Sequence, residues 1–142
     1  MATRNGSAEW RGDLKDGSGT LTVGDGVFEG QYSFSSRFEE GEGTNPEELI
    51  AAAHASCLAM ALSNMLADHG HPAESVKVAA KVHLRIVDGA PTIAEIDLDV
   101  EGKVPGIDDE HFRAHAEEAK AGCPVSRALA GVPEIKLNAR LA

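Results

Sequence analysis

Two cysteines, Cys57 and Cys123, are the only thiols in the chain. A cysteine thiolate can act as a nucleophile, a metal ligand or a redox centre. Two cysteines are too few for a disulfide scaffold, and their wide separation excludes a local zinc knuckle or a Cys-x-x-Cys redox motif. The pair is therefore idle, structural or reactive, and the residues around each thiol have to discriminate between these roles.

Cys57 lies in an apolar segment that is predicted to form a helix from Pro46 to about Asp68. Glu47 precedes Cys57 by ten positions, and at about 100° per residue both side chains leave the helix on similar sides, about three turns apart. The two cannot touch along the helix, so a longer side chain has to bridge them if they act together. Without such a bridge, a buried thiol is a small, inert hydrophobe whose pKa is raised by burial.

Arg37, in the segment before this helix, is a candidate for the bridging group. A guanidinium keeps its proton and can fork onto a carboxylate while it donates to a thiolate. The alternative is a solvated arginine among acidic neighbours.

Cys123 stands directly before Pro124, which suits the first position of a helix. The amides and the dipole of that helix would favour the thiolate form. The alternative is a buried cysteine that serves as a poor helix cap.

His54, three residues before Cys57, could be a base or a metal ligand, but a packed histidine with one hydrogen bond is the plainer interpretation. A metal site made of His54, Cys57, His69 and Cys123 would match no known zinc spacing. We therefore expect no metal.

Charge and length limit the class of protein. The 142 residues fit one domain, 1–142, and a net charge of −10 would repel nucleic acid and anionic membranes. The N-terminus has no apolar signal segment, so we expect a cytoplasmic protein, in which a resting disulfide is disfavoured. Polar residues such as His54, Ser56 and Asn64 interrupt the longest apolar stretch, which indicates a buried helix rather than a membrane span.

The remaining patterns predict an α+β fold in which an antiparallel sheet wraps the central helix. Short alternating runs up to Phe34 favour a meander, and 35–43 is expected to be a loop. Alternating residues predict strands over 75–87 and 94–101, joined by a turn at Asp88-Gly89-Ala90-Pro91. Helices are expected from Asp108 to Ala121 and over 124–130, followed by a strand over 135–141.

Several blocks of sequence carry a resemblance to a known family. They are Arg37-Phe38-Glu39, the run from Gly43 to Cys57 (GTNPEELIAAAHASC), Val104-Pro105-Gly106-Ile107, and the run from Ala119 to Ser126 (AKAGCPVS). These blocks strongly resemble the OsmC/Ohr family of osmotically inducible and organic hydroperoxide resistance proteins, over essentially the whole chain. The position of Arg37 resembles the OsmC branch.

The resemblance implies an intertwined homodimer with central helices packed together and sheets outside. It also implies a peroxidase that reduces organic hydroperoxides, and hydrogen peroxide more weakly, without metal, haem or flavin. Cys57 would be the peroxidatic thiolate, Cys123 the resolving cysteine, Arg37 the cation beside the thiolate, and Glu47 the carboxylate that orients Arg37. An external dithiol, in the family typically a dihydrolipoyl group on a protein, would reduce the disulfide.

Two other functions stay open. A non-catalytic stress-response module could use the two cysteines as a structural staple or bind a small apolar ligand. A metal-dependent hydrolase could use His54.

Overall fold

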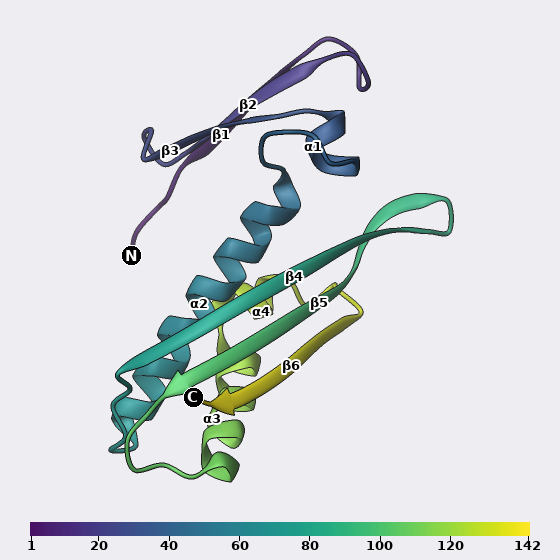
Figure 1. The fold of residues 1–142 in the computed structure, drawn as a ribbon. Helices are drawn as coiled ribbons and strands as arrows, with labels where there is room; N and C mark the ends of the chain where they lie inside the picture. Colours follow the sequence, from purple (N-terminus) through teal and green to yellow (C-terminus); the bar gives the residue numbers. More distant parts are fainter. The chain divides into compact units, whose positions relative to one another are not determined.

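The computed structural model describes residues 1–142 and has a mixed α+β architecture (Figure 1). The elements in chain order are β1 (Gly6–Arg11), β2 (Ser18–Val23), β3 (Phe28–Tyr32), α1 (Phe34–Phe38), α2 (Pro46–Asp68), β4 (Ser75–Val87), β5 (Ala90–Lys103), α3 (Asp109–Gly122), α4 (Pro124–Ala128) and β6 (Glu134–Leu141). The chain forms two compact units, Met1–Leu49 and Ile50–Ala142. The boundary between the units falls inside α2, which belongs to both. The expectation of a single domain over 1–142 stays a prediction.

The first unit contains the predicted meander. Strands β1, β2 and β3 pair in that order, and both pairings are antiparallel. The rings of Trp10 and Tyr32 lie 5.3 Å apart across this sheet. Gly19 lies between them, and a Cβ there would come within 2.7 Å of both rings. A side chain at position 19 would therefore push this aromatic pair apart.

The segment 35–43 was expected to be a loop, but its first part is helical. Ser33 and Ser36 form a capping box, in which the Ser36 amide donates to Ser33 Oγ (3.1 Å) and the Ser33 amide donates to Ser36 Oγ (2.8 Å). The fourth position of a capping box usually holds glutamate or glutamine. Serine at that position gives a weaker sequence signal, and the short helix α1 was missed for this reason.

Helix α2 begins and ends at the predicted residues. Asn45 Oδ1 accepts a hydrogen bond from the Glu48 amide (2.8 Å), and Pro46 occupies the first turn. At the other end, Gly70 adopts a φ of +83°, and the His71 amide donates to the carbonyl of Leu66 (2.8 Å). This is a Schellman motif, which favours glycine because its backbone turns left-handed.

The second unit packs α2 and α3 against one face of the sheet β4-β5-β6 (Figure 1). Fully buried side chains of this core include Leu58, Leu62 and Leu66 from α2 and Phe112 from α3. The β4–β5 hairpin is antiparallel, as expected, with a two-residue Asp88-Gly89 turn of positive φ. Strand β6 instead runs parallel to β5, because α3 and α4 form the crossover between them.

Only one side of α2 is covered in the single chain. Its most apolar 18-residue window has a mean hydropathy of 1.6, and 22% of that window is buried. By length and composition α2 could cross a membrane, a property that the core helix of a water-soluble protein shares. The exposed side includes Met60, whose side chain is 76% exposed. Within the single chain, the prediction of a buried helix therefore holds for one side of α2 only.

Charged side chains line the opposite face of the second sheet. Glu95 of β5 is buried and binds Arg85 of β4 and Lys136 of β6, so that one carboxylate links three strands. The hydrogen bonds from Lys136 and Arg85 lower the pKa of Glu95 from 4.5 to about 2. A carboxylate whose folded-state pKa is lowered stabilises the fold fully above its unfolded-state pKa. This stabilisation is lost as the pH falls from about 4.5 towards 2.

We therefore predict that Glu95→Gln lowers the free energy of unfolding at neutral pH and weakens its dependence on pH between about 2 and 4.5. Urea denaturation at a series of pH values measures both effects. Glu29→Gln, at an exposed glutamate without an ion pair, is the matched control. An unchanged pH dependence in Glu95→Gln would show that the three-strand contact does not stabilise the fold.

Candidate active site

The fold brings the two distant cysteines together in the second unit. Cys57 projects from the middle of α2 and is half-buried, whereas Cys123 is fully buried at the junction where α3 ends and α4 begins. Both are free thiols, and their side chains form a hydrogen bond with each other. The two side chains are therefore neighbours in the fold, although 65 residues separate them in the chain.

The electrostatics of the two sulfur atoms differ. Burial raises the pKa of Cys57, and its hydrogen bond with Cys123 raises this pKa further. Burial also acts to raise the pKa of Cys123, but the hydrogen bonds that Cys123 receives from Cys57 and Ser126 outweigh burial and lower this pKa overall. Because the two thiols interact, a negative charge on one opposes ionisation of the other. Cys57 therefore needs another cation or donor if it is to ionise first.

The first unit contains the predicted arginine and carboxylate as a second pair. Arg37 Nη2 lies 2.7 Å from Glu47 Oε1, and Arg37 Nε lies 3.1 Å from Glu47 Oε2, so the guanidinium grips the carboxylate with two nitrogens. Glu47 is 8% exposed, and Arg37 also lies over the ring of Phe38 at 5.3 Å. Nη1 of Arg37 makes no hydrogen bond within the chain, which leaves donors of a fixed cation free for another ligand.

Local structure holds Arg37 in this position. Its neighbour Ser36 donates from Oγ to the carbonyl of Thr44 (2.8 Å), and Asn45 Nδ2 donates to the carbonyl of Ser36 (2.9 Å). These two hydrogen bonds tie α1 to the start of α2. The arginine and Glu47 are therefore positioned by α1 and α2 together.

A mainly apolar pocket of about 370 Å³ adjoins Arg37 within the first unit. Its lining residues are Trp10, Gly12, Leu14, Tyr32, Ser33, Phe34, Arg37 and Phe38. One cation at the wall of an aromatic pocket suits a ligand that has a polar head and an organic body.

His54 of α2 and Ser126 of α4 form a contact that sequence analysis missed. His54 is fully buried, and its Nε2 lies 2.6 Å from Ser126 Oγ. Burial lowers the pKa of His54, so the ring is neutral at neutral pH. The prediction of a packed histidine with one hydrogen bond is confirmed, but Ser126 was not singled out. Its position three residues after Cys123, on the first turn of a helix, is the signal that was available.

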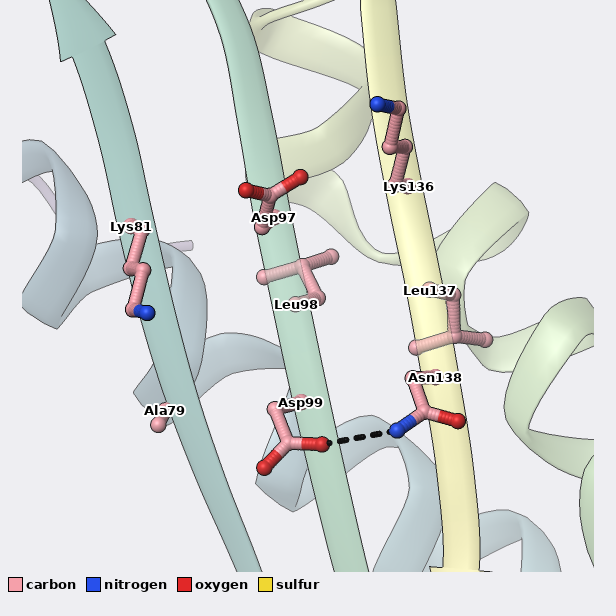
Figure 2. A pocket seen from close by; sticks show the side chains of 8 residues that line it. All are labelled: Ala79, Lys81, Asp97, Leu98, Asp99, Lys136, Leu137 and Asn138. Carbon is pink, nitrogen blue, oxygen red and sulfur yellow. Dashed lines mark hydrogen bonds between the residues drawn. The ribbon is translucent and has the colours of Figure 1, made fainter.

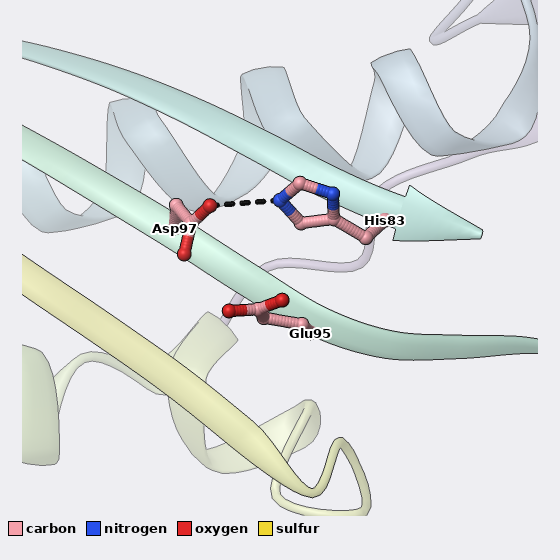
Figure 3. A group of neighbouring side chains, drawn as sticks. All are labelled: His83, Glu95 and Asp97. Carbon is pink, nitrogen blue, oxygen red and sulfur yellow. Dashed lines mark hydrogen bonds and ion pairs between the residues drawn. The ribbon is translucent and has the colours of Figure 1, made fainter. Parts of the chain in front are cut away.

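A group of possible metal ligands lies elsewhere, on the outer face of the second sheet (Figure 3). Ligand atoms of His83, Glu95 and Asp97 lie within 4.8 Å of one another. Glu95 is already neutralised by Arg85 and Lys136, and His83 Nε2 is hydrogen-bonded to Asp97 (2.7 Å). Two cations on the central ligand would oppose a metal ion, so this group is an ion-pair network of the sheet.

The same face carries a hollow of about 450 Å³ along β4, β5 and β6 (Figure 2). Asn138 donates to Asp99 there (3.2 Å), and Arg140 also binds Asp99 (2.7 Å). Of its charged lining residues, Asp97, Asp99 and Lys136 are each paired with a side chain outside the lining. None of the predicted site residues lines the hollow.

Comparison with known proteins relates this chain to one family. The family of OsmC-like proteins matches residues 39–138. Peroxiredoxin OsmC of Escherichia coli (strain K12) is 48% identical over 139 residues, which cover 97% of this chain and 96% of the relative.

Solved structures extend the comparison to the fold. The crystal structure of the organic hydroperoxide resistance protein OhrB of Bacillus subtilis has a TM-score of 0.76 at 26% identity, and the match covers 96% of this chain and 98% of that one. A Legionella pneumophila OsmC structure, at 23% identity, has a TM-score of 0.78 and covers 98% of both chains.

The match over most of the chain and the identity to a peroxiredoxin over nearly its full length confirm both the predicted family and the predicted fold class. This chain belongs to the OsmC family and is a peroxidase.

Proposed function

We propose that this peroxidase reduces organic hydroperoxides with Cys57 as the attacking thiolate and Cys123 as the resolving thiol. The observation that carries the proposal is the hydrogen bond between these two cysteines, the only thiols of the chain. An inert core cysteine needs no second thiol beside it.

The proposed reaction has two steps. In the first, the Cys57 thiolate attacks an oxygen of the hydroperoxide, the O–O bond breaks, and the leaving alkoxide takes a proton to form an alcohol. Cys57 is now a sulfenic acid. In the second step Cys123 attacks the Cys57 sulfur, the S–O bond breaks, and water leaves as the disulfide forms.

Arg37 is proposed to supply the positive charge that Cys57 requires, and Glu47 to orient Arg37. The fixed guanidinium with free donors supports this role, as does the resemblance of these positions to the family pattern. A guanidinium beside the reacting atoms stabilises both the thiolate and the negative charge on the leaving oxygen.

The aromatic pocket beside Arg37 supports an organic substrate in preference to hydrogen peroxide. Burying an alkyl or aryl group there would contribute about 25 cal/mol for each Å² of apolar surface removed from water. Hydrogen peroxide has no such group, so we propose that it is reduced more weakly.

Reduction of the Cys57–Cys123 disulfide is proposed to come from an external dithiol by thiol exchange, with a dihydrolipoyl protein as the leading candidate. We propose that the two cysteines do the chemistry without metal, haem or flavin. The proposed location is the cytoplasm, whose reducing conditions would return such a disulfide to the two free thiols.

A second copy of this chain is proposed to cover the exposed side of α2. That side carries a groove lined by Ala59, Met60, Ser63, Asn64, Ala67 and Val76, all apolar or small polar residues without a charge. Alanine and serine on a helix surface allow another helix to approach closely. The proposed assembly is a homodimer.

The roles of the cysteines can be tested by replacing each with serine. Cys57→Ser should lose turnover of cumene hydroperoxide with dihydrolipoamide, because no other thiol can replace the attacking one. Cys123→Ser should react once and then accumulate overoxidised Cys57, which intact mass spectrometry detects. Unimpaired turnover by Cys57→Ser would contradict the proposal. Wild-type protein that consumes no hydroperoxide, with equal loss of stability in both variants, would favour a structural pair of cysteines.

Removing the cation should slow the first step selectively. Arg37→Ala is expected to lower the second-order rate constant for hydroperoxide by about 100-fold, because one charged donor beside the developing charge is lost. Glu47→Gln should cause a smaller loss, since the arginine stays but is held less firmly. Stopped-flow measurement of Cys57 oxidation reports this step. Arg11→Ala, which breaks the exposed Arg11–Glu9 ion pair of the same unit, is the control and should keep the wild-type rate.

The homodimer can be tested at Met60, which is 76% exposed in the single chain. Met60→Glu would place a charge in the proposed interface and should shift the protein towards monomer in analytical ultracentrifugation. Lys77→Glu, on the solvent side of β4, introduces the same charge away from that face. A wild-type monomer at micromolar concentration would exclude the proposed assembly.

A further inference from the structure

A chain of three side chains connects α2 to the resolving cysteine. His54 Nε2 lies 2.6 Å from Ser126 Oγ, and the Ser126 side chain in turn hydrogen-bonds Cys123. Cys123 and His54 are fully buried, and Ser126 is 8% exposed. Such a chain has little access to water, so its hydrogen bonds have no competing partners.

The unpaired nitrogen of His54 determines the direction of these hydrogen bonds. His54 Nδ1 is buried and has no hydrogen-bond partner. A buried N–H without an acceptor is rarer in proteins than an acceptor without a donor, so the proton of the neutral ring belongs on Nε2. Nε2–H then donates to Ser126 Oγ, and the Ser126 hydroxyl is left to donate to Cys123 Sγ.

We propose that His54 and Ser126 hold Cys123 as the thiolate that resolves the sulfenic acid on Cys57. Ser126 donates directly to the reacting sulfur, and His54 is a positioning residue that fixes the direction of the serine hydroxyl. This inference rests on the proposed peroxidase cycle. It gives a role in that cycle to His54 and Ser126, which belong neither to the pair of cysteines nor to the Arg37–Glu47 pair.

The proposed role belongs to the second chemical step. Cys57 as a sulfenic acid has lost the S–H that it donates to Cys123 in the reduced protein. Ser126 then remains as the side-chain donor to Cys123. The Cys123 thiolate attacks the Cys57 sulfur, the S–S bond forms, the S–O bond breaks, and the departing hydroxide takes up the proton that Cys123 released. The products are the disulfide and water.

The groups that influence the pKa of Cys123 most lie on α2 and α4. Cys57 faces it from α2, and Ser126 and the backbone of Val125 face it from α4. His54 acts through Ser126, and burial of the ring keeps it neutral by lowering its pKa. Loss of the serine donor should therefore have a measurable effect on the pKa of Cys123.

The first test measures the pKa of Cys123 alone, in a Cys57→Ser background, from the ultraviolet absorbance of its thiolate. Ser126→Ala should raise this pKa by about one unit or more, because a hydrogen bond to a charged acceptor is lost. His54→Phe should raise it by less, while Ser126→Thr and His54→Gln keep a donor and should retain most of the wild-type value. Ser75→Ala, an exposed serine in the same unit, is the control.

An unchanged Cys123 pKa in Ser126→Ala would overturn the proposal. A shift in Ser126→Ala with none in either His54 variant would remove His54 from it. Because Ser126→Ala and Ser126→Thr change little volume, their comparison stands even if His54→Phe fails to fold. The measurement uses no hydroperoxide, so its outcome does not depend on whether the proposed peroxidase cycle is correct.

A second test follows the cycle in protein with both cysteines. Ser126→Ala should oxidise Cys57 at the wild-type rate after one equivalent of cumene hydroperoxide, but should form the disulfide more slowly. Under excess hydroperoxide it should accumulate sulfinic acid on Cys57, measured by intact mass, while Ser126→Thr should not. Slower Cys57 oxidation with unchanged disulfide formation would contradict a role in the second step.

Discussion

The hydrogen bond between the sulfur atoms of Cys57 and Cys123 is the interaction on which the proposed chemistry depends. Two interacting thiols do not ionise together, because ionisation of one opposes ionisation of the other. The environment of each sulfur therefore decides the order of events. The proposed role of Arg37 is to stabilise the negative charge on Cys57 when a hydroperoxide must be attacked.

Helices α2, α3 and α4 hold the two cysteines next to each other. Cys57 is on α2, whose leucines anchor it in the core, and its neighbour along the helix, His54, faces the same interior. Cys123 ends α3 and precedes α4, since Pro124 cannot continue α3 with its own amide. This junction leaves the thiol at the N-terminus of α4, one turn before Ser126. The packing of these helices in the core thus fixes the positions of both thiols.

Local sequence signals predicted the elements that local interactions determine. The bounds of α2 and the turn after Val87 were predicted because each depends on a few adjacent residues, among them Asn45, Gly70 and Asp88-Gly89. The turn is shorter than predicted, because Ala90 and Pro91 already belong to β5. The parallel pairing of β6 was not predicted, because alternation along a strand is the same for either direction. The Ser126–His54 contact joins residues that are far apart in the chain, and neither residue type is unusual in its segment. Its discovery required the fold.

The Arg37–Glu47 pair shows why a site predicted from residue types still depends on structure. Glu47 is buried, and a buried carboxylate is costly unless a cation satisfies it. Arg37 meets this need with two nitrogens, which also prevents the guanidinium from turning away. The short helix α1, which the sequence pattern did not indicate, presents this arginine at the wall of the aromatic pocket. A cation immobilised in this way stabilises negative charge without reorganising first, so the same contacts that stabilise the first unit prepare it for the proposed reaction.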